Sequence, residues 1–103
     1  MKIYDKAKWQ MDGGMEKKMV IEHFECVFRW LLNHHMLSED GQEMLESGID
    51  GEISLNTEMV TKEGADFLDM YYDDLIKQSS YDIVAEQTLM DSYFDKYQKQ
   101  IKQ

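Results

Sequence analysis

Residues 16–35, which read EKKMVIEHFECVFRWLLNHH, decide the fold because they form one long amphipathic pattern. Polar side chains recur there at every third or fourth position, which fits the 3.6-residue period of an α-helix. A helix whose polar stripe is so narrow buries most of its circumference, so we expect it to be the central helix. The stripe consists of Lys18, Glu22, Glu25, Arg29 and Asn33, and the apolar arc consists of Val20, Phe24, Val27, Phe28, Leu31 and Leu32.

An internal repeat follows this helix. The stretch MLSEDGQEMLE at 36–46 shares its pattern of apolar, hydroxyl, charged and glycine positions with MVTKEGADFLD at 59–69. Ser38 and Thr61 occupy the position of an N-terminal helix cap, with acidic residues in the turn that follows. The pattern predicts a short helix that ends near Ser47 and a longer one that ends near Lys77. Two copies are too few for a solenoid, so we interpret the repeat as reused local chemistry.

The last predicted helix begins after the serines at 79 and 80. Its apolar positions follow spacings of three and four, as in a core-facing stripe, and a dimer seam is the alternative interpretation. We therefore predict an all-α fold, a compact bundle of about four helices in a single domain over residues 1–103. Residues 1–15 form an N-terminal arm in this prediction, and 49–56 form a loop or one very short strand or hairpin. The stripe consists of Ile83, Gln87, Met90, Phe94, Tyr97 and Ile101.

The net charge limits the classes of partner. The 103 residues hold 21 acidic and 11 basic side chains, a formal charge of −10. Binding to a nucleic-acid backbone or to an anionic membrane requires a basic surface, so neither is expected. No stretch approaches the roughly 20 apolar residues of a membrane span. The first residues lack a signal-peptide pattern, and a single cysteine excludes an internal disulfide, so we expect a cytoplasmic protein.

The charge is unevenly distributed along the chain. Residues 1–35 hold six bases and five acids, whereas residues 36–95 hold two bases and sixteen acids. Asp66, Asp69 and Asp73 recur at helical spacing with Asp74 beside them, and like charges so placed disfavour an isolated helix. We interpret these four residues as a docking face for a basic protein partner, with a solvated surface as the alternative. Trp9 is a further candidate anchor if it is exposed, and otherwise attaches the arm to the bundle.

Other motifs give no site. Around Gly51 the spacing partly matches a calcium-binding loop, but a central ligand and the final carboxylate are missing. His23 and Cys26 are too far along the helix from His34 for all three to bind one metal ion, so no metal site is predicted. We expect Cys26 to be a buried apolar side chain and the histidines to be partly exposed. No catalytic constellation and no cofactor motif is present.

The opening YDKAKW at 4–9, then Gly13-Gly14, and the stretch from Leu37 to Asp50 resemble a family of small uncharacterised bacterial proteins with a YDKAxWH-type N-terminal motif. Gln10 stands where that motif has histidine. The family implies no activity that can be transferred. Small acidic proteins of this general kind resemble immunity or inhibitor proteins, and the two helix starts resemble those of winged-helix regulators.

The sequence therefore predicts a non-enzymatic, acidic protein-binding module. Its most concrete form is an immunity or inhibitor protein that docks Asp66, Asp69, Asp73 and Asp74 on a basic partner. The alternative is a winged-helix-like regulatory or dimerisation domain. A third possibility, a small enzyme that uses Cys26 or a carboxylate pair, lacks a convergent set of residues. The chain is expected to be a monomer or a homodimer.

Overall fold

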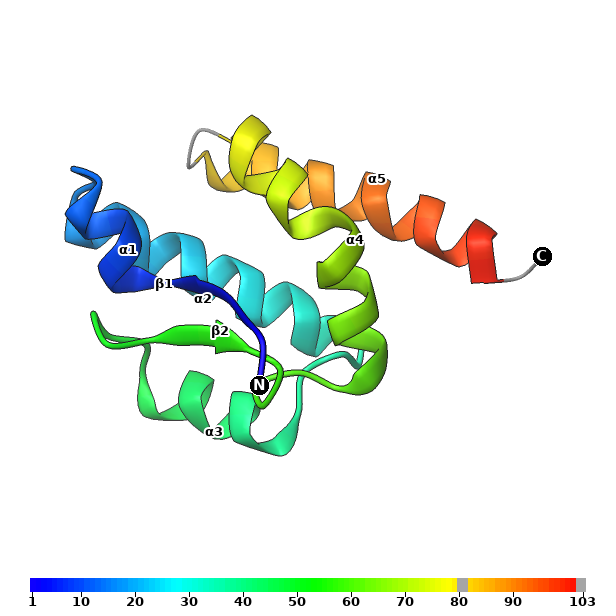
Figure 1. Cartoon of the computed structure of the whole chain (residues 1–103), viewed down its shortest axis with the longest axis horizontal. Helices are drawn as coiled ribbons and strands as arrows, with labels where there is room; N and C mark the ends of the chain where they lie inside the picture. The colour runs from blue at the N-terminus through cyan, green and yellow to red at the C-terminus, as the bar shows by residue number, and fades with distance from the viewer. Residues whose placement is uncertain (80–81, 102–103) are drawn as a thin grey trace.

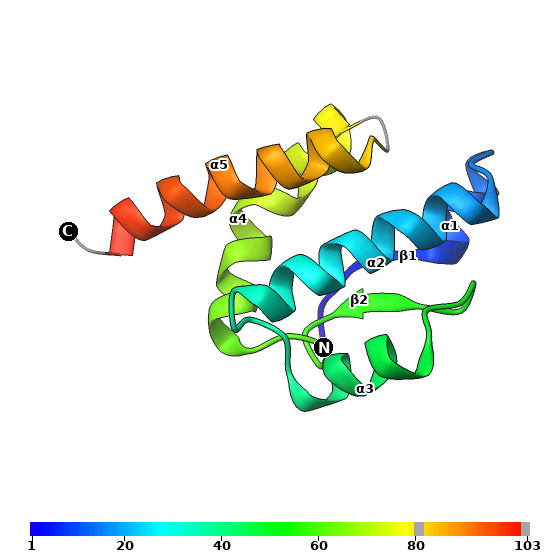
Figure 2. The same ribbon diagram turned by 180° about the vertical axis from the view of Figure 1, so that it is seen from behind.

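Helices dominate the computed structural model, which describes residues 1–79 and 82–101. Within these residues, five helices accompany two short antiparallel strands (Figure 1). Both views place α3 and β2 below α2 and α5 above it, while α4 runs from the level of the strands to that of α5 (Figures 1 and 2). The elements are β1 (Ile3–Lys6), α1 (Ala7–Asp12), α2 (Lys17–Asn33), α3 (Glu39–Ser47), β2 (Ser54–Asn56), α4 (Lys62–Ser79) and α5 (Ile83–Ile101).

Helix α2 is the central helix, as its pattern predicts. It packs against α1, α3 and α5. Five of the six residues of the predicted apolar arc are buried, whereas Leu32 at the edge of the arc is 38% exposed. Four residues of the polar stripe are exposed and Glu25 is half-buried. The 3.6-residue period therefore located both faces of this helix.

The predicted N-terminal arm, residues 1–15, contains a strand and a helix that the sequence analysis did not predict, β1 and α1. Strand β1 pairs with β2, with Asp5 opposite Leu55, and the backbone N–H of Ala7 continues the pairing to the carbonyl of Ile53 at 3.1 Å. Helix α1 then raises the number of helices from the predicted four to five in the described residues. The very short strand considered for 49–56 is present as β2.

The two copies of the repeat pair with each other. Leu37 and Val60 form an antiparallel bridge, flanked by hydrogen bonds from the Ser38 N–H to the Met59 carbonyl and from the Thr61 N–H to the Met36 carbonyl. Helices α3 and α4 thus begin from the two sides of one short bridge. The hydroxyls of Ser38 and Thr61 accept the N–H groups of Gly41 and Gly64, both at 3.1 Å, which confirms the predicted caps.

The glycines of the repeat allow this close pairing. A Cβ on Gly41 would lie 2.2 Å from the carbonyl oxygen of Met59, and a Cβ on Gly64 would lie 2.6 Å from that of Met36. Each glycine therefore packs against the backbone of the other copy, where no larger residue fits. The interpretation of the repeat as local chemistry missed this contact between the copies.

The buried side of α5 differs from the predicted stripe by one position near its start. Met90 and Tyr97 are buried and Phe94 packs against the core, which confirms the core-facing interpretation for these three. Gln87 is exposed, however, and the neighbouring Glu86 is buried in its place. The side chain of Ile101 lies outside the described residues. Ile83 is half-buried against the core. The stripe therefore includes a buried carboxylate, which apolar periodicity does not predict.

Candidate functional site

The predicted docking residues lie on one exposed side of α4. Asp66, Asp69 and Asp73 occupy positions three and four apart, so they share a helix face, and all three are exposed. Met70 lies on the same face between them and is 44% exposed. Asp74 is also exposed, one position beyond the end of this set. We use the name acidic face of α4 for Asp66, Asp69, Met70, Asp73 and Asp74.

One member of the acidic face is paired within the chain. The Nζ of Lys2 lies 2.7 Å from Oδ1 of Asp69, in an ion pair whose two side chains are about half exposed. The hydrogen bond from Lys2 lowers the pKa of Asp69 below its ordinary value. The count of charge along the sequence missed this pairing, because 67 positions separate the two residues. Asp66, Asp73 and Asp74 form no ion pair within the described residues.

The structure does not bring Trp9 to the acidic face. Trp9 lies on α1, which packs against α2 and β1, while the acidic face lies on α4 (Figure 1). Its side chain is 51% exposed, and the Nζ of Lys6 lies 5.6 Å from the centre of its ring. Trp9 is therefore exposed, as a binding anchor requires, but it belongs to a separate surface.

A chain of polar side chains, mostly buried, connects five elements of the fold. Nε2 of His23 on α2 lies 2.9 Å from the hydroxyl of Tyr72 on α4, and Nδ1 of His23 contacts the carboxylate of Glu86 on α5. Tyr72 donates its hydroxyl proton to Asp5 on β1 at 2.6 Å. Gln10 donates from Nε2 to both oxygens of Asp5, at 2.9 and 3.1 Å. We call these five residues the His23 network.

The prediction that the histidines are partly exposed is wrong for His23, which is fully buried. The single proton of the Tyr72 hydroxyl goes to Asp5, so Nε2 of His23 must donate to the hydroxyl oxygen. A further proton lies between Nδ1 and Glu86, because a carboxylate can only accept there. Glu86 is fully buried and Asp5 nearly so, so this set of acidic and basic groups lies inside the core. The network joins elements of the core.

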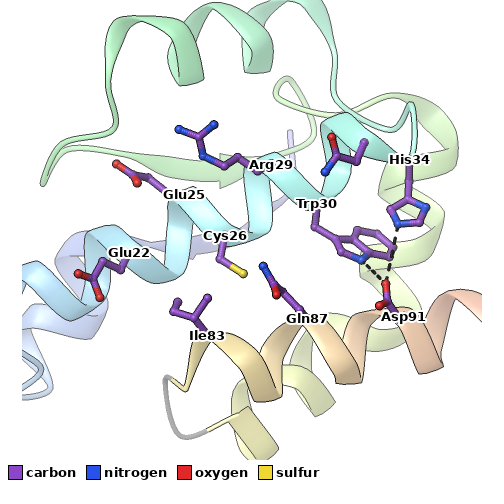
Figure 3. A pocket seen from close by; sticks show the side chains of 10 residues that line it. Glu22, Glu25, Cys26, Arg29, Trp30, His34, Ile83, Gln87 and Asp91 are labelled. Carbon is purple, nitrogen blue, oxygen red and sulfur yellow. Dashed lines mark hydrogen bonds and ion pairs between the residues drawn. The ribbon is translucent and has the colours of Figure 1, made fainter.

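A groove lies between α2 and α5. It encloses about 510 Å³, which lies within the range of small-molecule sites. Figure 3 shows α2 along one side and α5 along the other, with the side chains of Cys26, Ile83 and Gln87 between them. The residues that line it are Glu22, Glu25, Cys26, Arg29, Trp30, Asn33, His34, Ile83, Gln87 and Asp91. We call this cavity the α2/α5 groove.

One end of the α2/α5 groove holds an oriented carboxylate. Trp30 donates from Nε1 to Oδ1 of Asp91 at 2.9 Å, and Nε2 of His34 lies 4.0 Å from the same oxygen (Figure 3). The indole of Trp30 is held between Phe67 and the ring of His34, whose centroids lie 5.0 and 3.9 Å away. Partial burial lowers the pKa of His34, although Asp91 acts in the opposite direction. The lowered pKa favours the neutral form of the His34 imidazole near pH 7.

Cys26 in the floor of the groove is 7% exposed, as its apolar surroundings predict. Burial, and secondly the nearby Glu86, raise the pKa of the Cys26 thiol to about 12. The thiolate is the reactive form, and at pH 8 it makes up roughly one part in 10⁴ of such a thiol. Burial and the raised pKa of the thiol both oppose the reaction of Cys26 as a nucleophile at neutral pH.

The first prediction concerns this thiol. Iodoacetamide at pH 8 is expected to leave Cys26 unmodified in the folded protein, because both burial and the raised pKa oppose attack. In roughly 6 to 8 M urea, which is expected to unfold the protein and expose the thiol, the same reagent should label Cys26 completely. Intact-mass spectrometry measures both states. Labelling of the folded protein at the rate of the unfolded protein would contradict the assignment.

Within residues 1–79 and 82–101, no three side chains of His, Cys, Asp or Glu converge as a metal site does. Across the same residues, every helix is too short or too polar to be a candidate membrane span.

Comparisons of the chain with protein-family models, with curated proteins and with solved structures found no match. Functional assignment therefore rests on the geometry of the three places described above, the acidic face of α4, the His23 network and the α2/α5 groove.

Proposed function

We propose that the protein is a non-enzymatic binding module that docks the acidic face of α4 on a basic protein partner. The observation that carries this proposal is the position of Met70, which is 44% exposed between Asp66, Asp69 and Asp73. An exposed flexible apolar side chain within a charged rim matches the usual anatomy of a protein interface. The carboxylates would steer a basic partner into register, and Met70 would supply apolar contact.

The charge pattern supports the same conclusion. Like charges at three- and four-residue spacing disfavour the helix by some tenths of a kcal/mol per pair, so the fold gains nothing from them. Lys2 neutralises Asp69 but leaves Asp66, Asp73 and Asp74 without an ion pair in the described chain. The most concrete form of the proposal remains an immunity or inhibitor protein that covers a basic site of its partner.

The winged-helix alternative gains no support from the order of elements. In the described chain, both strands come before α4 in the sequence and pair with each other, and α4 is followed by helix α5 and not by a strand. The stripe considered as a dimer seam is occupied within the chain, since Met90 and Tyr97 are buried in the core.

A capture experiment tests the docking proposal. The natural chain, the variant Asp66→Asn/Asp73→Asn and the control Glu43→Gln/Glu46→Gln are immobilised and exposed to host lysate at low salt. The control loses the same two charges from exposed positions of α3. We expect the natural chain and the control to retain one Lys- and Arg-rich protein, and the α4 variant to retain at least about tenfold less of it.

Ionic strength provides the second measurement. Docking through exposed carboxylates should weaken steeply between about 0.05 and 0.5 M salt, because the screening length shortens over this range. Met70→Ala should weaken binding at both salt concentrations, since its contact is apolar. Equal retention of the same protein by all variants would contradict the proposal.

A further inference from the structure

The α2/α5 groove has a charge pattern of its own, on elements other than the acidic face of α4. Its lining contains three carboxylates, on Glu22, Glu25 and Asp91, and one guanidinium, on Arg29. Figure 3 shows the side chains of Arg29 and Glu25 directed away from α5, whereas Cys26 and Trp30 point toward it, so Glu22 and Asp91 are the carboxylates left along the groove. The interior of the groove therefore carries a negative potential, which favours a cationic ligand.

The carboxylates lie apart along the groove. Glu22 lies toward one end of the cavity and Asp91 toward the other (Figure 3). The part of α2 that lines the groove, from Glu22 to Asn33, rises roughly 16 Å along the helix axis. No three ligating groups converge within the described residues. A compact metal ion needs convergent oxygens, so an extended cation with separated charges fits this arrangement better.

The space between the two ends is uncharged. Ile83 and the thiol of Cys26 lie there, with the amide of Gln87 beside them (Figure 3). Burial keeps the thiol in its neutral form, as its raised pKa shows. Such a floor accommodates methylene groups and offers the Gln87 amide to an intermediate amine.

Asp91 is prepared to receive a cation. The hydrogen bond from Trp30 already orients the carboxylate of Asp91, so binding of a ligand need not pay the entropy of ordering this side chain. The Asp91 side chain remains 68% exposed. Its nearest positively chargeable group in the described chain is His34, at 4.0 Å. No Lys or Arg of the described chain forms an ion pair with Asp91, Glu22 or Glu25.

We propose that the α2/α5 groove binds a flexible aliphatic polyamine, with one ammonium group at Asp91, a second at Glu22 and the methylene chain along Cys26 and Ile83. This site is independent of the docking proposal, because it uses α2 and α5 and needs no protein partner. A basic peptide segment is the competing occupant, and the experiment below distinguishes the two.

Spermidine is the probe, and the purified full chain is the binding protein. Trp9→Phe removes the second indole, so that the N–H resonance of Trp30 reports on the groove alone. We expect saturable binding by isothermal titration calorimetry and a shift of the Trp30 indole resonance in nuclear magnetic resonance. Butylamine, which has one charge, should bind at least about tenfold more weakly than spermidine, because it engages one end only.

Matched variants separate the groove from the general attraction of an acidic protein for cations. Asp91→Asn retains an acceptor for Trp30, and together with Glu22→Gln it should weaken spermidine binding at least about tenfold. Glu43→Gln/Glu46→Gln loses the same charge from α3 and should bind as the natural chain does. Circular dichroism checks that each variant is folded.

Three results would overturn the proposal. One is an equal affinity for spermidine of the Glu22→Gln/Asp91→Asn variant and of the α3 control, which would mean that spermidine binds only through the overall negative charge. Another is binding without any response of the Trp30 indole. The third is a poly-lysine peptide that shifts the Trp30 indole while spermidine does not, which would assign the groove to a basic protein segment instead.

Discussion

Gly41→Ala is expected to destabilise the protein by about 3 kcal/mol, which is a large fraction of the stability of a domain of this size. The added Cβ would lie 2.2 Å from the Met59 carbonyl oxygen and 2.7 Å from Cδ1 of Leu37. Backbone and buried side chain must both move to make room. Alanine in place of glycine inside a helix ordinarily stabilises by about 1 kcal/mol, so the contact reverses the sign of the effect.

Urea unfolding followed by circular dichroism measures this change. Gly64→Ala should act in the same direction, because its Cβ would lie 2.6 Å from the Met36 carbonyl oxygen. Gly13→Ala is the control, since its Cβ would make contacts of 3.4 and 3.5 Å and its φ is −79°. A Gly41→Ala variant as stable as the control would mean that the two copies of the repeat do not pack as described.

Glu86→Ala is the second substitution with a large expected effect, about 3 to 5 kcal/mol. It removes the partner of Nδ1 of His23 in a fully buried position and leaves a cavity beside it. The donor then has neither protein nor bulk water to bind. Glu86→Gln, which keeps the size and an acceptor oxygen, should cost less than Glu86→Ala.

A double-mutant cycle checks the origin of this effect. His23→Leu and Glu86→Leu, measured singly and together by urea unfolding, should show a coupling of about 1 to 3 kcal/mol, because the double variant leaves neither group of the pair buried alone. Glu43→Ala on the surface of α3 should change stability by less than about 0.5 kcal/mol. Strict additivity of the two leucine variants would contradict the coupling of His23 to Glu86.

Patterns with a local cause were predictable from the sequence. The polar stripe of α2 follows the helical period, and the caps at Ser38 and Thr61 follow from hydrogen bonding within one turn. The strand at 54–56 and the burial of Cys26 also agree with local composition. In each case the residues that fix the structure lie within about one or two helical turns of one another.

Features that depend on distant partners were not predictable in the same way. The first residues gave no sign of a strand, because β1 is defined by its pairing with residues near 55. His23 and Glu86 are separated by 63 positions, and each belongs to a residue type that is usually found at the protein surface. The α2/α5 groove is likewise formed by two helices that are distant in the sequence. Each helix could be predicted from its own pattern, but the contact between them could not.

The acidic face was predicted in its position but not in its net charge. The spacing of Asp66, Asp69 and Asp73 placed them together correctly, because helical geometry alone decides it. The ion pair of Asp69 with Lys2 depends on the path of β1, which the sequence did not reveal. Charge counted along a chain therefore gives only a first approximation to charge on a face.

The His23 network also bears on how the chain reaches its fold during synthesis. A ribosome adds about 5 to 20 residues per second, so the 81 positions from Asp5 to Glu86 take roughly 4 to 16 s to make. Asp5 meets Gln10 early and Tyr72 later in that interval, whereas His23 lacks its buried partner Glu86 until the end of it. The interior around His23 therefore reaches its final set of contacts only after the start of α5 has been made.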